Sequence, residues 1–194
     1  MTKSDLKIRE VAETKSEVNT LEQYDEQLQI CQEIFVQKSK DYGTSWRIMR
    51  TKSITDQLFI KAQRIRTLEE TGVSKVGDGI EGEFQALVNY GLMALIQLHH
   101  KPNAEGNLSA DDARRLYEEQ AHEVRQIMIA KNHDYGEAWR DMRVSSFTDL
   151  ILSKILRLKQ IEDNQGKTIV SEGLEGHYTD IVNYSLFGLI RINE

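Results

Sequence analysis

The chain has 194 residues, a single cysteine and a formal net charge of −6. The length suits one large domain or two small ones, and the acidic balance argues against unspecific binding to nucleic acid or to an anionic membrane. A single cysteine excludes an intrachain disulfide and favours a reducing, cytoplasmic setting, and we expect neither a signal peptide nor a membrane span.

In chain order, residues 1–19 are predicted to form an N-terminal extension, and a first helix is predicted over about residues 21–37. Apolar residues in that stretch follow helical spacing. The sequence Asp-Tyr-Gly then ends the helix, with Gly43 as the stop signal. A second helix is predicted to begin after Ser53, a plausible N-cap, with Asp56 in its first turn, where the helix dipole favours a carboxylate.

A third helix is predicted over residues 81–98, after a loop that contains glycine. Its sequence is apolar nearly all round, which is typical of a buried helix. Corresponding helices in the second half are predicted to start near Ala110, after Ser146 and at Glu175, the last of them ending near Ile192. Because strand patterns of period two are absent, the predicted fold class is all-α.

A ten-residue pattern occurs twice, as DYGTSWRIMR from Asp41 and as DYGEAWRDMR from Asp134. With one extra residue in the second half, EGEFQALVNY then aligns with EGHYTDIVNY. The linker between the halves holds Pro102, the only proline, and a capping-box pattern that begins at Ser109. The chain is therefore predicted to be a duplicated three-helix unit, packed as a pseudo-twofold helical bundle. The predicted repeats cover residues 20–101 and 109–194, joined by 102–108.

Polar and aromatic positions are kept between the halves, while apolar positions have drifted within their class. Packing tolerates volume-matched swaps, whereas specific hydrogen bonds and charge contacts do not. The kept positions are therefore candidate functional residues. The alternative is a recent duplication that has had little time to diverge.

Two cations stand three residues apart on each predicted second helix, Lys61 and Arg64 in the first half and Lys154 and Arg157 in the second. This spacing places them on one helix face, where they could clamp a phosphate. The alternatives are a solvated face or an ion pair with a neighbouring helix.

Each half also places a tryptophan beside arginines, Trp46 near Arg50 and Trp139 near Arg143. A tryptophan with neighbouring arginines can stack a nucleobase and hold its phosphates. The alternative is a tryptophan that caps the hydrophobic core where the chain turns. The tyrosine of each Asp-Tyr-Gly sequence leaves the same two choices open.

Carboxylates gather in or near the last apolar stretch at Glu172, Glu175 and Asp180. Such oxygen ligands suit Mg²⁺, and the aligned residue in the first half is Ala86 at the position of Asp180, so a metal is predicted in the second repeat. The alternative is that these carboxylates bond Lys154 and the neighbouring arginine across a helix interface.

Taken together, Lys131-x-x-Asp134-Tyr135-Gly136, Lys154-x-x-Arg157, Glu172 and Asp180-x-x-Asn183-Tyr184 resemble the nucleotide-modification-associated domain family of bacteria and phages. That family looks distantly similar to the all-α nucleoside triphosphate pyrophosphatases of the MazG and dimeric dUTPase type. The resemblance implies a role in nucleotide metabolism with Mg²⁺ as cofactor. The Glu-Glu-x-x-Glu cluster of those pyrophosphatases is missing here.

We therefore expect a protein that binds a nucleotide or another phosphorylated small molecule. If it is an enzyme, it would hydrolyse the α–β phosphate bond with Mg²⁺; no catalytic residue is assigned. The alternative is a non-catalytic helical module that binds a nucleotide or a partner protein, and a homodimer stays open. The predicted binding residues are Lys38, Asp41, Tyr42, Trp46, Arg50, Lys61, Arg64 and Asn89 in the first repeat, and Lys131, Asp134, Tyr135, Trp139, Arg143, Lys154, Arg157 and Asn183 in the second.

Overall fold

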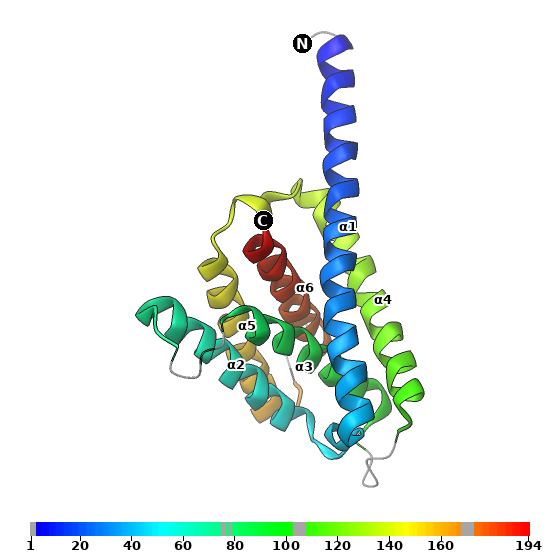
Figure 1. The fold of residues 1–194 in the computed structure, drawn as a ribbon, viewed down its shortest axis with the longest axis vertical. Coiled ribbons are helices and arrows are strands. Elements are labelled where there is room, and N and C mark those ends of the chain that lie inside the picture. Colours follow the sequence, from blue (N-terminus) through cyan, green and yellow to red (C-terminus); the bar gives the residue numbers. More distant parts are fainter. Residues whose placement is uncertain (1–2, 75–76, 78, 103–107, 168–172) are drawn as a thin grey trace.

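The computed structural model describes residues 3–74, 77, 79–102, 108–167 and 173–194, with side chains described from residue 19 onward. All regular structure in these ranges is helical, which confirms the predicted all-α fold. In chain order the elements are α1 (Lys3–Tyr42), η1 (Ser45–Ile48), α2 (Thr51–Thr71), α3 (Glu81–His100), α4 (Ala110–Tyr135), η2 (Ala138–Asp141), α5 (Val144–Asp163) and α6 (Leu174–Asn193) (Figure 1).

The first helix is much longer than the predicted stretch of residues 21–37. It begins at Lys3 because residues 3–42 contain neither proline nor glycine, so nothing in the local sequence breaks the helix. It ends where predicted, at Gly43, whose φ of 75° is accessible at low cost only to glycine. Gly136, with φ 58°, ends α4 in the same way.

The predicted N-caps at Ser53 and Ser146 are wrong. A 3₁₀ turn is followed by an extended residue, Arg50 or Arg143, and the α-helix starts immediately after it. Both serines therefore lie inside the first turn, and the Ser53 amide donates to the Arg50 carbonyl at 2.9 Å. In contrast, the predicted cap at Ser109 is confirmed, since its hydroxyl accepts from an amide three residues on at 3.0 Å.

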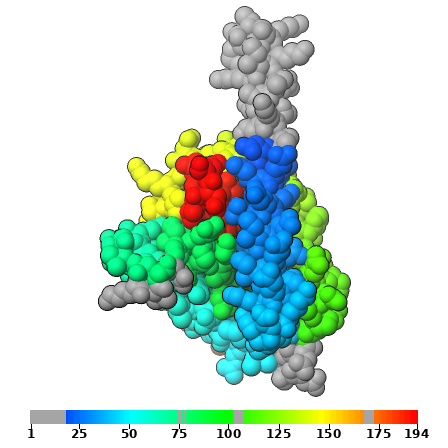
Figure 2. Space-filling model, viewed as in Figure 1, coloured from blue at the N-terminus to red at the C-terminus, as the bar shows by residue number. Residues whose placement is uncertain are grey.

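The six long helices form three layers of paired elements (Figure 1). The central pair, α3 and α6, makes the most extensive contact and lies between the α2–α5 pair and the α1–α4 pair. Each layer thus holds one helix from each repeat, and the two repeats share one core. Figure 2 shows the described part of α1 crossing the surface between the end of α6 and α4. Within the described ranges, no helix has both the length and the apolar character of a membrane span.

Hydrogen bonds between α2 and α5 show the pseudo-twofold relation directly. Thr55 Oγ1 donates to Glu162 Oε1 at 2.9 Å, and the aligned residues in exchanged roles, Thr148 Oγ1 and Glu69 Oε1, are also 2.9 Å apart. A contact from residue i to residue j that is matched by one from j to i is the mark of a twofold interface. The predicted pseudo-twofold packing is therefore confirmed; the exact repeat boundaries at residues 20, 101 and 109 stay predictions.

Two aligned aspartates join the same interface. Asp56 pairs with Lys159 at 2.7 Å, and Asp149 pairs with Arg66 at 3.8 Å. The sequence placed Asp56 in the first turn of its helix. In the structure both aspartates lie beyond that turn. Their carboxylates therefore form exposed ion pairs between the two repeats and do not lie at a helix N-terminus.

Glycine lets α3 and α6 approach closely. A Cβ atom added to Gly91 would lie 2.5 Å from Val182 Cγ2, and one added to Gly188 would lie 2.8 Å from the Phe84 ring. Both distances are below any van der Waals contact, so the central pair can pack this tightly only because these positions carry no side chain.

We expect Gly91→Ala to lower the free energy of unfolding by about 1–3 kcal/mol, because the added methyl group overpacks the contact with the stiff Val182 side chain. The matched control is Gly82→Ala in the same helix, where nothing lies within 4 Å of an added Cβ. That control should be neutral or stabilise by up to about 1 kcal/mol, since alanine favours helices. Urea unfolding of the two variants measures the difference, and equal effects would contradict the close-approach account.

Candidate functional site

Two surface cavities, one in each repeat, lie at corresponding places in the described part of the chain. The first, of about 560 Å³, lies where the C-terminal end of α1, the η1 turn and α3 meet. The second, of about 340 Å³, lies between α4, η2, α5 and α6. Both volumes fall in the range of small-molecule sites.

The two cavities are equivalent residue by residue. Except for Leu150, every residue that lines the second cavity aligns with a residue that lines the first. The shared positions, first repeat before second, are Phe35 and Met128, Lys38 and Lys131, Ser39 and Asn132, Tyr42 and Tyr135, Ser45 and Ala138, Trp46 and Trp139, Met49 and Met142, Ala86 and Asp180, Asn89 and Asn183, Tyr90 and Tyr184, and Met93 and Phe187.

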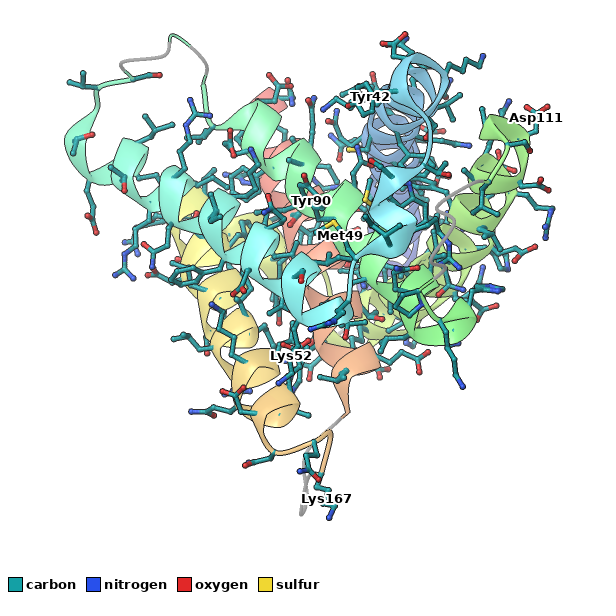
Figure 3. The ribbon with its side chains drawn as sticks, turned by 90° about the horizontal axis from the view of Figure 1, so that it is seen from below. Tyr42, Met49, Lys52, Tyr90, Asp111 and Lys167 are labelled. Carbon is teal, nitrogen blue, oxygen red and sulfur yellow. The ribbon has the colours of Figure 1, made fainter. Side chains whose placement is uncertain are left out.

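Aromatic and thioether side chains give each cavity an apolar wall. Tyr42 and Tyr135 are 65% and 74% exposed, so each offers its ring to solvent at a cavity. Figure 3 labels Tyr42, Met49 and Tyr90, which reach the first cavity from three different elements. The Met49 and Tyr90 positions were not among the sequence predictions, although the repeated Asn-Tyr pair carried the signal for Tyr90.

The tryptophans, in contrast, belong to the core. Trp46 and Trp139 are only 8% and 7% exposed. The Trp139 ring stacks on Phe187 at 4.3 Å, and the Arg140 guanidinium lies over the same ring at 4.4 Å. Two groups at such distances cannot share a face, so Trp139 has no free face for a nucleobase. The core-capping alternative therefore describes this residue, and the tyrosines are the better candidates for stacking.

The arginines next to the tryptophans have structural partners. Arg47 is buried and donates hydrogen bonds to the Gln97 side chain and to the His100 and Lys101 carbonyls. These groups lie at the C-terminal end of α3, where the negative end of the helix dipole favours a cation. Arg140 pairs with Glu194 at 2.7 Å near the end of α6. Both arginines therefore anchor a third helix to its turn.

In the second cavity a buried carboxylate neutralises two lysines. Lys131 Nζ and Lys154 Nζ lie 2.8 and 2.5 Å from the two Asp180 oxygens. Burial alone would raise the pKa of Asp180, but the hydrogen bonds and charges of the two lysines outweigh it and hold that pKa below its ordinary value. Lys154 therefore forms the ion pair that the sequence analysis gave as the alternative to a phosphate clamp. Arg157 is exposed.

In the first repeat the carboxylate sits one helical turn earlier. Glu83 pairs with Lys61 at 3.2 Å and with Arg64, and it does not line the cavity. Ala86 stands at the position of Asp180. Lys38, the cavity lysine, makes no ion pair or hydrogen bond with the residues that the structure describes. The first cavity therefore keeps a positive charge that the second has lost.

The cavity asparagines also differ. Asn89 uses its whole amide, accepting from Tyr117 OH at 2.8 Å and donating to the Cys31 carbonyl at 3.1 Å. Asn183 accepts from Tyr24 OH at 2.7 Å, and within the described ranges its Nδ2 group donates no hydrogen bond. An amide donor that lines a cavity in this way can meet an acceptor on a ligand.

The two predicted metal ligands that the structure describes, Glu175 and Asp180, have other partners. Glu172 lies outside the described residues. Glu175 is exposed and 3.6 Å from His99, and Asp180 is held by two ammonium groups. Among the described residues, no group of three or more His, Cys, Asp or Glu side chains could hold a metal. The magnesium site stays a prediction, and the described residues do not fit it in this arrangement.

Half of the sixteen predicted binding residues line a cavity. These are Lys38, Tyr42, Trp46 and Asn89 in the first and Lys131, Tyr135, Trp139 and Asn183 in the second. The other eight do not line one: Asp41, Arg50, Asp134, Arg143 and Arg157 are exposed, and Lys61, Arg64 and Lys154 bond carboxylates of the third helices.

A family model described as nucleotide modification associated domain 1 matches residues 38–98 and 131–192. The two segments begin at the cavity lysines, Lys38 and Lys131, and run through the third helix of each repeat. They therefore contain nearly all the residues that line the two cavities. No curated protein and no solved structure matches the chain.

We expect Asp180→Asn to lower the free energy of unfolding by about 2 kcal/mol at pH 7, because it leaves two ammonium groups without their carboxylate. The folded-state pKa of Asp180 is depressed, so its stabilisation is present above the ordinary pKa of about 4 and is lost as the pH falls through the folded value. The difference between wild type and variant should therefore shrink as the pH falls below about 4.

The control for this titration is Glu175→Gln, which removes an exposed carboxylate from the same helix and should change stability by less than about 0.5 kcal/mol. Urea unfolding across the pH range measures both. A difference for Asp180→Asn that is absent at pH 7, or that persists unchanged in acid, would contradict the role given to Asp180.

Proposed function

The chain belongs to the nucleotide modification associated domain 1 family, with one copy in each half, and on that premise we propose that its two cavities bind a nucleotide or a closely related molecule that carries a planar base. The observation that carries the proposal is the duplication of one cavity with its aromatic wall, lysine and asparagine. The description of the family supplies the class of ligand.

The aromatic wall supports a planar ligand. Tyr42 and Tyr135 each combine a large exposed ring with a place on a cavity wall. Every base has a π-face, and stacking on an aromatic side chain contributes about 1–3 kcal/mol per base. A ligand that covered these rings would also bury the apolar methionines beside them.

The polar groups support recognition of a base edge and a phosphate. Asn183 lines the second cavity and has an Nδ2 group that donates to none of the described residues, and Lys38 lines the first. Small-molecule sites commonly combine an apolar wall with a few such convergent polar groups, which fix the orientation of the ligand. Lysine binds phosphate as a point charge, so it needs no second cation in a fixed geometry.

Hydrolysis of the α–β phosphate bond with Mg²⁺ is the more specific function that the sequence suggested. The described residues support it less than binding, because Asp180 is committed to two lysines and no three-ligand group accompanies it. We therefore derive no catalytic step, and the likeness to MazG-type pyrophosphatases stays a prediction. The cavities support a nucleotide-binding role whether or not hydrolysis follows.

The test is calorimetry of the wild-type protein against a panel of nucleoside and deoxynucleoside mono- and triphosphates, with and without Mg²⁺. We expect at least one member to bind, and expect the double variant Tyr42→Ala with Tyr135→Ala to lose about 1–3 kcal/mol of binding free energy per site. Ile60→Ala is the matched control, because Ile60 is an exposed apolar residue outside both cavities.

Failure of every panel member to bind folded wild-type protein would overturn the proposed function. Equal binding by the tyrosine double variant would move the ligand away from the cavities. Release of pyrophosphate only in the presence of Mg²⁺ would add the hydrolytic function.

A further inference from the structure

We propose that the two cavities have divided their ligands by charge, so that the first takes the phosphorylated form and the second takes an uncharged form, a nucleoside or a base. This inference rests on the proposed function and names the ligand class of each cavity. One exchange between the repeats carries it, the aspartate at position 180 against the alanine at position 86.

The lysine at each cavity has a different electrostatic environment. Lys131 donates to Asp180 at 2.8 Å, so its charge is already met by a carboxylate that lines the same cavity. Lys38 and Ala86 line the first cavity together, and Lys38 bonds none of the described residues. A phosphate entering the first cavity would gain an ammonium partner, whereas in the second it would approach a buried carboxylate.

The carboxylate of the first repeat does not neutralise the charge of Lys38. Glu83 is one turn away from Ala86 on α3 and is occupied by Lys61 and Arg64. It is not among the residues that line the first cavity. Movement of the acidic group by one helical turn therefore removes negative charge from this cavity while each repeat keeps an ion pair between its second and third helices.

Cavity size points in the same direction. The first cavity measures about 560 Å³ and the second about 340 Å³. Three aligned lining residues are bulkier in the second, where Phe187, Asn132 and Asp180 replace Met93, Ser39 and Ala86. Two are smaller, since Met128 and Ala138 replace Phe35 and Ser45. The second cavity thus has less room for the phosphate in addition to the base.

The chain supplies its own reporters for the experiment, since its two tryptophans line one cavity each. Trp139→Phe leaves Trp46 as the only indole and reports the first cavity, and Trp46→Phe leaves Trp139 to report the second. Each protein is titrated with the same deoxynucleosides and with their 5′-monophosphates, and the change in tryptophan fluorescence gives an affinity for each form.

We expect the first cavity to bind the monophosphate about tenfold more tightly than the nucleoside, and the second to show no such preference. Added to the Trp139→Phe protein, Ala86→Asp should abolish the preference of the first cavity. Added to the Trp46→Phe protein, Asp180→Asn should create one in the second. Circular dichroism verifies that every variant is folded.

Calorimetry without the tryptophan substitutions provides a second measurement. Lys38→Met should remove most of the gain that the phosphate gives to the wild-type protein. The control Lys52→Met removes an exposed lysine of α2 outside both cavities, and it should leave that gain unchanged.

The outcomes separate the two claims. Binding with the same phosphate preference in both cavities, or a preference in the second cavity alone, would overturn the division by charge and leave the proposed function standing. Absence of any response to nucleosides and monophosphates from either tryptophan, together with no heat of binding to the wild-type protein, would overturn the proposed function and this inference with it.

Discussion

The structure depends on one hydrogen bond that is made twice between the repeats. Tyr24 on α1 donates to Asn183 on α6, and Tyr117 on α4 donates to Asn89 on α3. Both tyrosine side chains are fully buried, so each hydroxyl needs a partner, and the partner is an asparagine of the other repeat. Because those asparagines line the cavities, the wall of each cavity is held in place from behind by the opposite repeat. Each cavity is lined by residues of one repeat, but an asparagine of its wall is hydrogen-bonded by the other.

Duplication on this plan leaves the scaffold fixed and the cavities free to differ. Two hydrogen bonds between the repeats are reciprocal, Tyr–Asn and Thr–Glu, and both halves keep these residues. Among the aligned residues that line the two cavities, one pair differs in charge, Ala86 and Asp180. The carboxylate that pairs with the lysine of the second helix belongs to Glu83 in the first repeat and to Asp180 in the second. This exchange preserves the ion pair between helices and changes what the cavity can attract.

The sequence predicted the duplication, the helices and their shared core, because these follow from periodicity and from alignment of the two halves. It also offered the pairing of Lys154 with Asp180 as an alternative, since a buried carboxylate requires a partner. It could not predict which tryptophan faces are covered, because Phe187 is far from Trp139 along the chain and only packing brings them together. The spacing of Lys154 and Arg157 left a phosphate clamp, a solvated face and an ion pair open, because spacing gives a helix face and not the residues packed against it. Comparing the two halves of the sequence identifies the positions that both halves keep, but it does not identify the contacts that the two repeats make with each other.

The central claim is that the two aligned cavities are the ligand sites. A crystal structure of the wild-type protein soaked with a deoxynucleoside monophosphate tests this most directly. The account predicts a base against Tyr42 in the first cavity, with its phosphate beside Lys38. Ligand found only outside both cavities, or a phosphate seated against Asp180 in the second, would contradict it.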